Sequence, residues 1–329
     1  MIRPLLMTSM AALLLACSAP SAEGVAEAEG ASESAEDVKS LVPDLPTDRI
    51  KAGSFEDVLR EYRQMNDRLD RVSAPIRLSN AALCTETFRD PGFQAHSLED
   101  YPERMRGVAQ ALLGLEPNAI YVRSVRRGSP AEKADIQPGD RILRLNGRAV
   151  PGGPTMTRFY SALSRGAFAG RETRLTLRTP DGQEYETILQ SQTACDYPTR
   201  VIFSQEINGH TDGQEVYITS ELMRGVPDDV NLALITAHEM AHAIAGHMNQ
   251  APTKALELEA DRMALVLMER AGYDIDAAIT YWADAAHPHR RLQDDSDSHP
   301  TIVERYENFR QEQARIRDLK RADKALKFN

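Results

Sequence analysis

Residues 229 to 247 place hydrophobic side chains on most faces of one predicted helix, with Asp228 or Asp229 suited to the N-cap position. A helix that is apolar almost all round has to be deeply buried. Its apolar residues are Val230, Leu232, Leu234, Ile235, Ala237, Ala241, Ile244 and Ala245. A second helix is predicted from Ala255 to Ala271. From Ile302 to Lys327 the charges alternate along a third helix, which predicts a solvated face packed on one side.

Between residues 110 and 192 the pattern changes to short alternating runs separated by turns. Such alternation predicts half-buried strands, and Asp-Gly or Asn-Gly pairs between them predict turns. The turn pairs are Asn146-Gly147 and Asp181-Gly182, and strands are expected at 119–125, 141–145, 173–178 and 185–189. This segment is therefore expected to form a β-rich domain of its own.

The apolar helix contains three polar side chains, His238, Glu239 and His242, in the pattern H-E-x-x-H. Burying a carboxylate and two imidazoles without partners is costly. Residues four apart share one face of a helix, so the two histidines can present ring nitrogens to one zinc ion. Glu239 is turned about 100° away, where it can act as a general base. Because the motif also recurs by chance, a purely structural role is the alternative.

The second helix carries an acidic pair, Glu257 and Asp261, that is again four apart and shares a face. Thermolysin-like zinc enzymes use such a pair, with the glutamate as third ligand and the aspartate hydrogen-bonded to a ligand histidine. Glu259 is a rival ligand but points to the opposite side. A solvated helix face is the ordinary alternative. His247 ends the first helix and is expected to interact with its terminal carbonyl groups.

The segments HEMAH (238–242) and ELEAD (257–261), with Ser298-His299-Pro300 and Arg305 downstream, resemble the HtpX-like zinc metallopeptidases of peptidase family M48. The resemblance implies an α+β fold: a mainly helical gluzincin domain with a small edge sheet. It implies that His299 and Arg305 stabilise the oxyanion or hold substrate, and in some members the histidine caps the zinc. The implied ligands of one Zn²⁺ per chain are His238, His242 and Glu257.

Upstream, the segment that begins near Asn208 resembles the edge-strand element of that family. Asn208 matches the asparagine of this element, whereas Gly209 and His210 depart from its usual pair of a small and an aromatic residue. The strand predicted at 215–219 is expected to offer an unpaired edge to an extended substrate backbone. His210 is either an extra metal ligand or, by preference, fills the aromatic place. The spacing of His96 from other residues matches no motif, so no functional role is predicted for it.

The run GSPAEKADIQPGDRILRLNGRAV (128–150) resembles a PDZ domain of the bacterial protease-associated kind. The segment Leu112–Leu115 occupies the expected place of the loop that binds a peptide carboxylate, which makes Gly114 and Leu115 candidate substrate-binding residues. Asp135 stands where the family commonly has glycine and is expected to be left-handed. A PDZ domain that serves only as a spacer or lid is the alternative.

Two cysteines remain once Cys17 is set aside, and in an oxidising compartment Cys84 and Cys195 are expected to form a disulfide. Two buried free cysteines are the alternative. A bond would close a loop of roughly a hundred residues, worth about 4–5 kcal/mol in the chain-entropy model. The PDZ domain (110–192) would then be an insertion clamped at its base, and 45–109 would join 193–329 in one peptidase domain.

The N-terminal residues are predicted to be a targeting segment rather than part of the fold. Residues 1–17 combine a positive start with a short apolar stretch and end in a pattern that resembles a bacterial lipobox, with Cys17 as the lipidated residue. Ser18 favours the outer membrane of a Gram-negative cell envelope, facing the periplasm. An ordinary signal peptide is the alternative. Residues 18–44 are predicted to be a flexible acidic tether.

A net charge of −10 argues against a nucleic-acid partner, because no basic stripe is available to neutralise phosphates. The complete pattern predicts a zinc metalloendopeptidase that hydrolyses misfolded or unassembled envelope proteins, with the PDZ domain for substrate capture or regulation. A PDZ-based scaffold or chaperone with an inactive zinc site is the alternative. The oligomeric state stays open.

Overall fold

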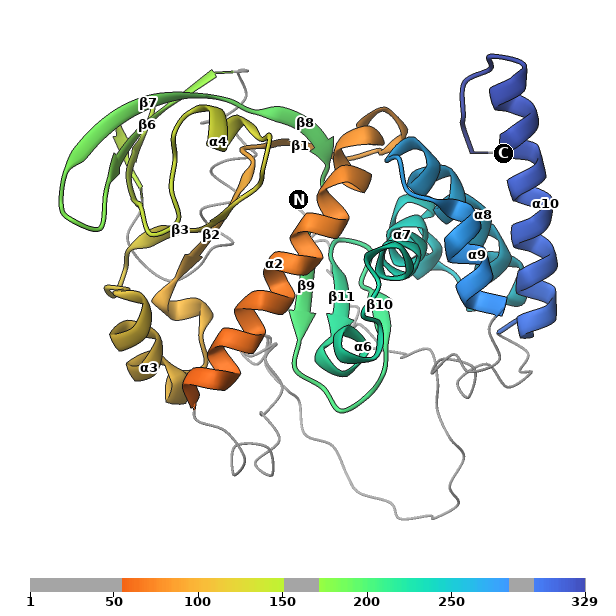
Figure 1. Ribbon diagram of the computed structural model, residues 1–329, viewed down its shortest axis with the longest axis horizontal. Coiled ribbons are helices and arrows are strands. Elements are labelled where there is room, and N and C mark those ends of the chain that lie inside the picture. Colours follow the sequence, from red (N-terminus) through yellow and green to blue (C-terminus); the bar gives the residue numbers. More distant parts are fainter. Residues whose placement is uncertain (1–54, 151–171, 284–298, 329) are drawn as a thin grey trace, which may run out of the picture.

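The computed structural model describes residues 55–150, 172–283 and 299–328. The predicted signal peptide, Cys17 and the tether at 18–44 lie outside these residues. Helix α2 (Phe55–Ser79) runs through the middle of the molecule, between a β-rich half and a helical half (Figure 1). In the ranges described, no helix has both the length and the apolar character that a membrane crossing requires.

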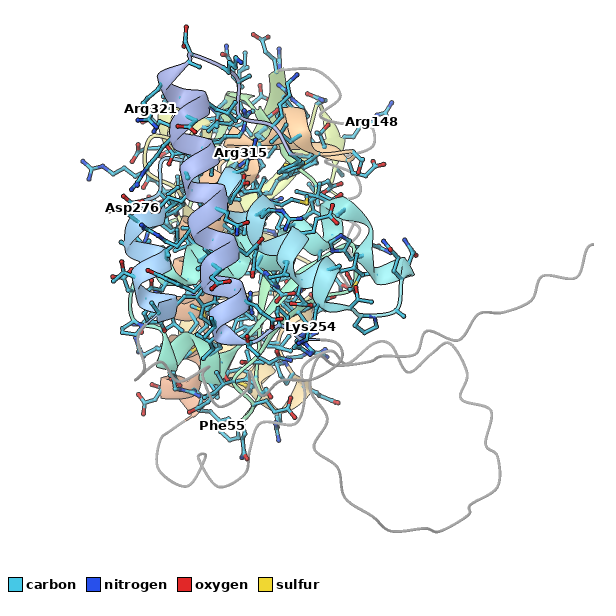
Figure 2. The ribbon with its side chains drawn as sticks, turned by 90° about the vertical axis from the view of Figure 1, so that its right-hand side faces the viewer. Phe55, Arg148, Lys254, Asp276, Arg315 and Arg321 are labelled. Atoms are coloured by element: carbon cyan, nitrogen blue, oxygen red, sulfur yellow. A yellow bond between two sulfur atoms is a disulfide. The ribbon has the colours of Figure 1, made fainter. Side chains whose placement is uncertain are left out.

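The helical half is built from α7 (Asp229–Ala245), α8 (Lys254–Arg270), α9 (Ile275–Ala283) and α10 (Ile302–Arg321). Asp228 caps α7, because its side chain accepts the backbone N–H groups of Val230 and Asn231. Leu232 and Ala237 have no exposed surface, so the apolar helix is buried as its composition predicts. Figure 2 shows α10 along the outside of this half, where its exposed face carries Arg321.

A three-stranded sheet packs against α7 in the order β10 (Gly209–Thr211), β11 (Val216–Thr219), β9 (Thr199–Ile202), and α6 (Ser220–Gly225) follows β11. The prediction that the strand at 215–219 offers an unpaired edge is wrong. That strand is β11, which lies in the centre, antiparallel to β10 and parallel to β9. Among the described strands, β10 is the edge that lies against α7.

The β-rich half is an antiparallel sheet in the order β2 (Phe93–Ser97), β3 (Ile120–Val125), β4 (Arg141–Leu145), β6 (Glu172–Arg178), β7 (Glu184–Gln190), with β5 (Arg148–Ala149) beside β4. Its core is formed by side chains from successive strands, among them Phe93, Val122, Ile142, Leu175 and Leu177. The short helix α4 (Pro130–Lys133) precedes Asp135, whose φ of 56° is the left-handed conformation predicted for it.

This sheet begins earlier in the chain than the predicted boundary at residue 110, because β2 pairs with β3. The chain between them forms η3 (Leu98–Asp100) and α3 (Glu103–Leu113). Gly114 ends α3 with a φ of 67°, and Leu115 is buried in a cluster with Leu59 of α2. Gly114 and Leu115 thus lie between α3 and β3, and their role in binding a peptide carboxylate stays a prediction.

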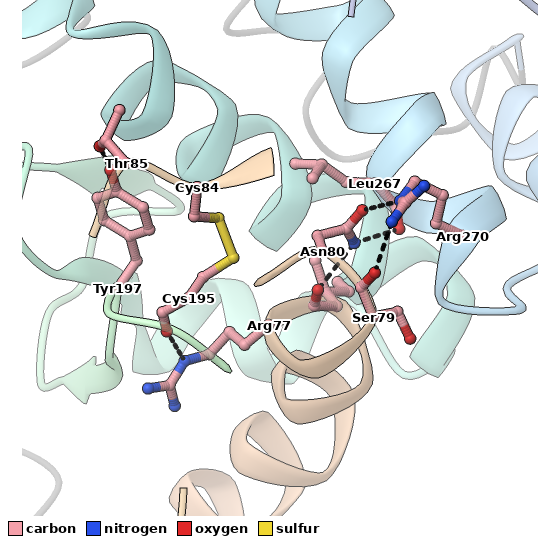
Figure 3. The surroundings of a disulfide bond; sticks show 10 residues. Arg77, Ser79, Asn80, Cys84, Thr85, Cys195, Tyr197, Leu267 and Arg270 are labelled. Atoms are coloured by element: carbon pink, nitrogen blue, oxygen red, sulfur yellow. Dashed lines mark hydrogen bonds between the residues drawn. A yellow bond between two sulfur atoms is a disulfide. The ribbon is translucent and has the colours of Figure 1, made fainter. Parts of the chain in front are cut away.

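The two halves are joined at a base that includes a disulfide. Strand β1 (Thr87–Asp90) pairs antiparallel with β8 (Gln192–Cys195), and Cys84, just after η2 (Ala81–Leu83), is bonded to Cys195, with Cα atoms 5.6 Å apart. Figure 3 shows Arg77 donating to the carbonyl oxygen of Cys195 and Asn80 donating to that of Leu267 in α8. The entry and exit of the β-rich half are thus tied to the end of α2.

A buried charge network fastens the β-rich half to α2. Nη1 of Arg126 lies 3.1 Å from both carboxylate oxygens of Asp70 in α2, and its Nη2 pairs with Asp90. Gln94 of β2 also donates to Asp70, and the N–H of Gly92 donates to Asp90 at 2.7 Å. Burial opposes the charge of Arg126, but the two carboxylates hold its pKa above the ordinary value.

Candidate metal centre

Helix α7 carries the two histidines of the site on one buried face. His238 and His242 are one helical turn apart, and their Nε2 atoms lie 3.1 Å from each other. Both side chains are almost fully buried. Two imidazoles whose Nε2 atoms lie this close together can bind one cation between them.

Glu257 of α8 completes the donor set. Its Oε2 lies 3.3 Å from Nε2 of His238, and its Oε1 lies 3.5 Å from Nε2 of His242. Ligand atoms of these three residues all fall within 4.8 Å of one another, and among the described residues they form a cluster that could hold a metal ion. Two histidines and a glutamate fit a catalytic zinc site, which uses three protein ligands and leaves a position open.

The charges around the cluster favour an added cation. Although burial opposes its charge, hydrogen bonds to Asp261 and Glu257 raise the pKa of His238 to about 10. Burial also opposes the charge of Glu257, yet the two histidines hold its pKa well below the usual range. The carboxylates therefore stay ionised and draw a proton onto the imidazole when no metal ion is present. A divalent cation would supply that positive charge.

The first histidine is held from behind by α8 and α10. Nδ1 of His238 lies 2.9 Å from Oδ1 of the fully buried Asp261. Arg305 of α10 donates to both oxygens of Asp261, with Nε 2.8 Å from Oδ2. The Arg305 guanidinium also lies 4.6 Å from the ring centre of Trp282 in α9. Arg305 was expected to stabilise the oxyanion; the structure places it against Asp261.

His242, the second histidine, contacts a residue that the sequence pattern did not place beside it. His247, in the turn η5 (His247–Asn249), has its Nδ1 3.0 Å from Nδ1 of His242 rather than lying at the helix carbonyls. Glu259, the rejected ligand, has Oε2 3.6 Å from Nε2 of His247. Burial and the His242 ring lower the pKa of His247. In the sequence, His247 follows His242 by five residues, which is the one feature that could have suggested a contact. If the helix had continued, this spacing would have turned the His247 ring away from His242.

Glu239 lies beside β10. A Cβ atom at Gly209 would lie 3.5 Å from Cγ of Glu239 and 3.3 Å from Cγ2 of Ile235. Glycine at this position therefore lets β10 approach α7 beside the predicted base. In the described part of the chain, no hydrogen bond or ion pair engages the Glu239 carboxylate.

The remaining predicted residues lie around this centre. The backbone N–H of Asn208 donates to Oγ1 of Thr219, which fixes the start of β10 against the end of β11. His210 stacks on the ring of Tyr217 at 5.1 Å, which favours the aromatic place over a ligand role. His299 is half-buried and lies two residues before Thr301, the N-cap of α10. Its contribution to the site stays a prediction.

Comparison with known proteins gives two family matches. Residues 204–255 and 251–313 match the model of peptidase family M48, and residues 121–179 match that of the PDZ domain. The chain thus contains one region similar to family M48 peptidases and one region similar to PDZ domains. Each match falls on one half of the fold: the M48 match on the metal centre, and the PDZ match on the antiparallel sheet.

Curated relatives resemble a smaller part of the chain. A probable CtpA-like serine protease of Staphylococcus aureus (strain bovine RF122 / ET3-1) is 28% identical over 114 residues, which are 32% of this chain and 22% of that protein. The same protein of strain MSSA476 matches with the same identity and coverage. The chain thus spans about a fifth of the length of these relatives.

Two solved structures also match part of the chain. The HtrA3 PDZ domain bound to a phage-derived ligand has 19% identity and a TM-score of 0.25, covering 33% of this chain and 89% of that one. The HtrA-type protease AlgW with a decapeptide has 20% identity and a TM-score of 0.26, and the match covers 32% of this chain and 30% of that one.

Proposed function

We propose that this protein is a zinc-dependent metalloendopeptidase of the HtpX-like gluzincin type. The observation that carries the proposal is the convergence of His238, His242 and Glu257 within 4.8 Å, inside the segment that matches peptidase family M48. Asp261 and Arg305 hold the first histidine in place, which is the support that a metal-binding imidazole requires.

A bound zinc ion would polarise the scissile carbonyl and make a water molecule acidic. Glu239 would take the proton of that water and return it to the amine that leaves. The edge strand β10, which lies beside Glu239, would hold an extended substrate backbone by strand addition. His299 would stabilise developing charge, and Arg305 would act by fixing Asp261.

The substrates we propose are misfolded or unassembled proteins of a Gram-negative cell envelope. The support is the PDZ domain, a module that binds peptides, together with the disulfide and the lipobox-like pattern that ends at Cys17. Lipidation of Cys17 would anchor the protein at the outer membrane, facing the periplasm. The PDZ domain would capture substrate or regulate access to the site.

The catalytic proposal is tested by comparing the wild type with Glu239→Gln, each loaded with zinc and assayed for bound metal and for cleavage of casein. The variant is expected to keep its zinc and its fold and to lose proteolysis, because the amide cannot take up a proton. Equal casein cleavage by both proteins at equal zinc content would overturn the assignment of the base. A wild type that binds no zinc would overturn the metal assignment.

The anchor is tested separately in cells given labelled palmitate. The wild-type chain is expected to incorporate the label and to sediment with outer membranes, whereas Cys17→Ser is expected to do neither. Incorporation of label into the Cys17→Ser variant would contradict the proposed anchor.

A further inference from the structure

The turn that follows the active-site helix returns a buried imidazole to the metal centre. Gly246 ends α7 in the left-handed conformation, with a φ of 68°, and the chain then forms η5. This reversal brings His247 against His242, with ring centres 5.0 Å apart and ring planes at 78°. His247 is 4% exposed, so this contact is shielded from solvent.

The contact has only one consistent pattern of protons once His242 is a metal ligand. A neutral imidazole that offers the lone pair of Nε2 carries its proton on Nδ1. The Nδ1–H of His242 then needs an acceptor, and among the described residues Nδ1 of His247, at 3.0 Å, is in place to accept it. His247 in turn carries its proton on Nε2, the nitrogen that lies 3.6 Å from Oε2 of Glu259.

The two metal-binding histidines are thus held by different means. His238 is oriented by Asp261, a carboxylate with no exposed surface that Arg305 clamps. His242 is oriented by a neutral ring, and the carboxylate behind that ring is 43% exposed in its side chain. Partners of this kind fix the tautomer and orientation of a metal-binding imidazole.

We propose that His247 is the positioning residue for His242: its Nδ1 accepts the Nδ1–H of His242 and holds Nε2 toward the metal position. This inference rests on the proposed function, since it assigns a role in the same metal site. It gives His247 a role that its position in the sequence did not suggest.

The test measures zinc affinity by chelator competition and the visible absorption spectrum of the Co²⁺-loaded protein in His247→Asn and His247→Gln. The asparagine amide oxygen can take the place of Nδ1, whereas the longer glutamine places its oxygen nearer the position of Nε2. We expect His247→Asn to keep the wild-type spectrum and most of the affinity. His247→Gln should lose about 10- to 100-fold in affinity and show an altered spectrum.

A matched control uses His96, a deeply buried histidine of the β-rich half, which is 5% exposed and has its Nδ1 2.8 Å from the hydroxyl of Tyr101. His96→Phe is expected to leave zinc affinity and the Co²⁺ spectrum unchanged, and His247→Phe to change both. Equal affinity and equal spectra for His247→Asn and His247→Gln would overturn the inference. Because these readouts are independent of turnover, an inactive but zinc-binding wild type would refute only the proposed activity.

Discussion

Arg305 of α10 grips Asp261 of α8 with two nitrogens, and Asp261 in turn holds Nδ1 of His238 at 2.9 Å. A residue 44 positions away in the chain from Asp261 thereby sets the orientation of a candidate metal ligand. The geometry links α10 to the candidate metal centre, so that its packed side supports the site while its other side is solvated as predicted.

Arg305→Met is expected to weaken zinc binding about 10- to 100-fold, because Asp261 loses the group that orients it. It should also lower the free energy of unfolding by about 3–5 kcal/mol, since a buried carboxylate is left without its cation. Zinc titration and urea unfolding measure the two effects. Trp282, the single tryptophan of the chain, lies against Arg305 and reports both by fluorescence.

Arg317→Met is the matched control for that experiment. Arg317 is on the same helix and pairs with Asp276, but both side chains are about half exposed. Its removal is expected to cost less than about 1 kcal/mol and to leave zinc binding unchanged. Similar zinc affinities for the two variants would refute the role assigned to Arg305.

The metal-free protein is expected to lose stability as the pH rises from about 6.5 to about 10. Burial opposes the charge of His238, but Asp261 and Glu257 raise its pKa to about 10, above the ordinary value of 6.5 for histidine. A group whose pKa is raised on folding stabilises the fold fully below its unfolded pKa, and this contribution disappears as the pH passes the folded pKa.

Urea unfolding in EDTA at several pH values measures this dependence. His238→Gln lacks the titrating group and should show a flatter profile over the same interval. The zinc-loaded wild type should also be flatter there, because a bound metal requires the neutral imidazole. A metal-free wild type whose stability is constant between these pH values would contradict the prediction.

Gly209→Val is expected to reduce kcat by at least about tenfold while the zinc content stays near that of the wild type, because the base is displaced but not the ligands. A Cβ added at Gly209 would lie 3.3 Å from side-chain atoms of Ile218 and Ile235. The larger valine therefore forces β10 to move away from α7 and Glu239. Gly107→Val is the control, since a Cβ there meets nothing within 4 Å. Unchanged kcat in Gly209→Val would show that β10 tolerates the shift.

Arg126→Met is expected to loosen the PDZ domain from α2 and to cost about 3–5 kcal/mol, because Asp70 and Asp90 are both buried and lose their shared cation. Hydrogen exchange of residues 90–97 and urea unfolding would detect the change. Arg178→Met, which breaks the exposed pair with Glu184 on the same domain, should alter neither measurement much. Equal effects of the two substitutions would argue against a fastening role.

The features that were predicted well depend on neighbours in the chain. Helical spacing alone puts His238 and His242 on one face, and the apolar residues around them require burial. The PDZ segment was recognisable because its turns need particular backbone conformations, as the φ values of 56° at Asp135 and 50° at Asn146 show. Such constraints act over a few residues and leave a readable pattern.

The features that were missed depend on partners that meet only when the chain packs. The order of the small sheet made β10 the edge instead of the strand at 215–219, and the pairing of β2 with β3 extended the β-rich half to residues before 110. His247 reaches His242 because Gly246 reverses the chain. The H-E-x-x-H pattern on α7 could thus be recognised in the sequence. The residues that orient its histidines are brought there by long-range packing, which the local spacing does not encode.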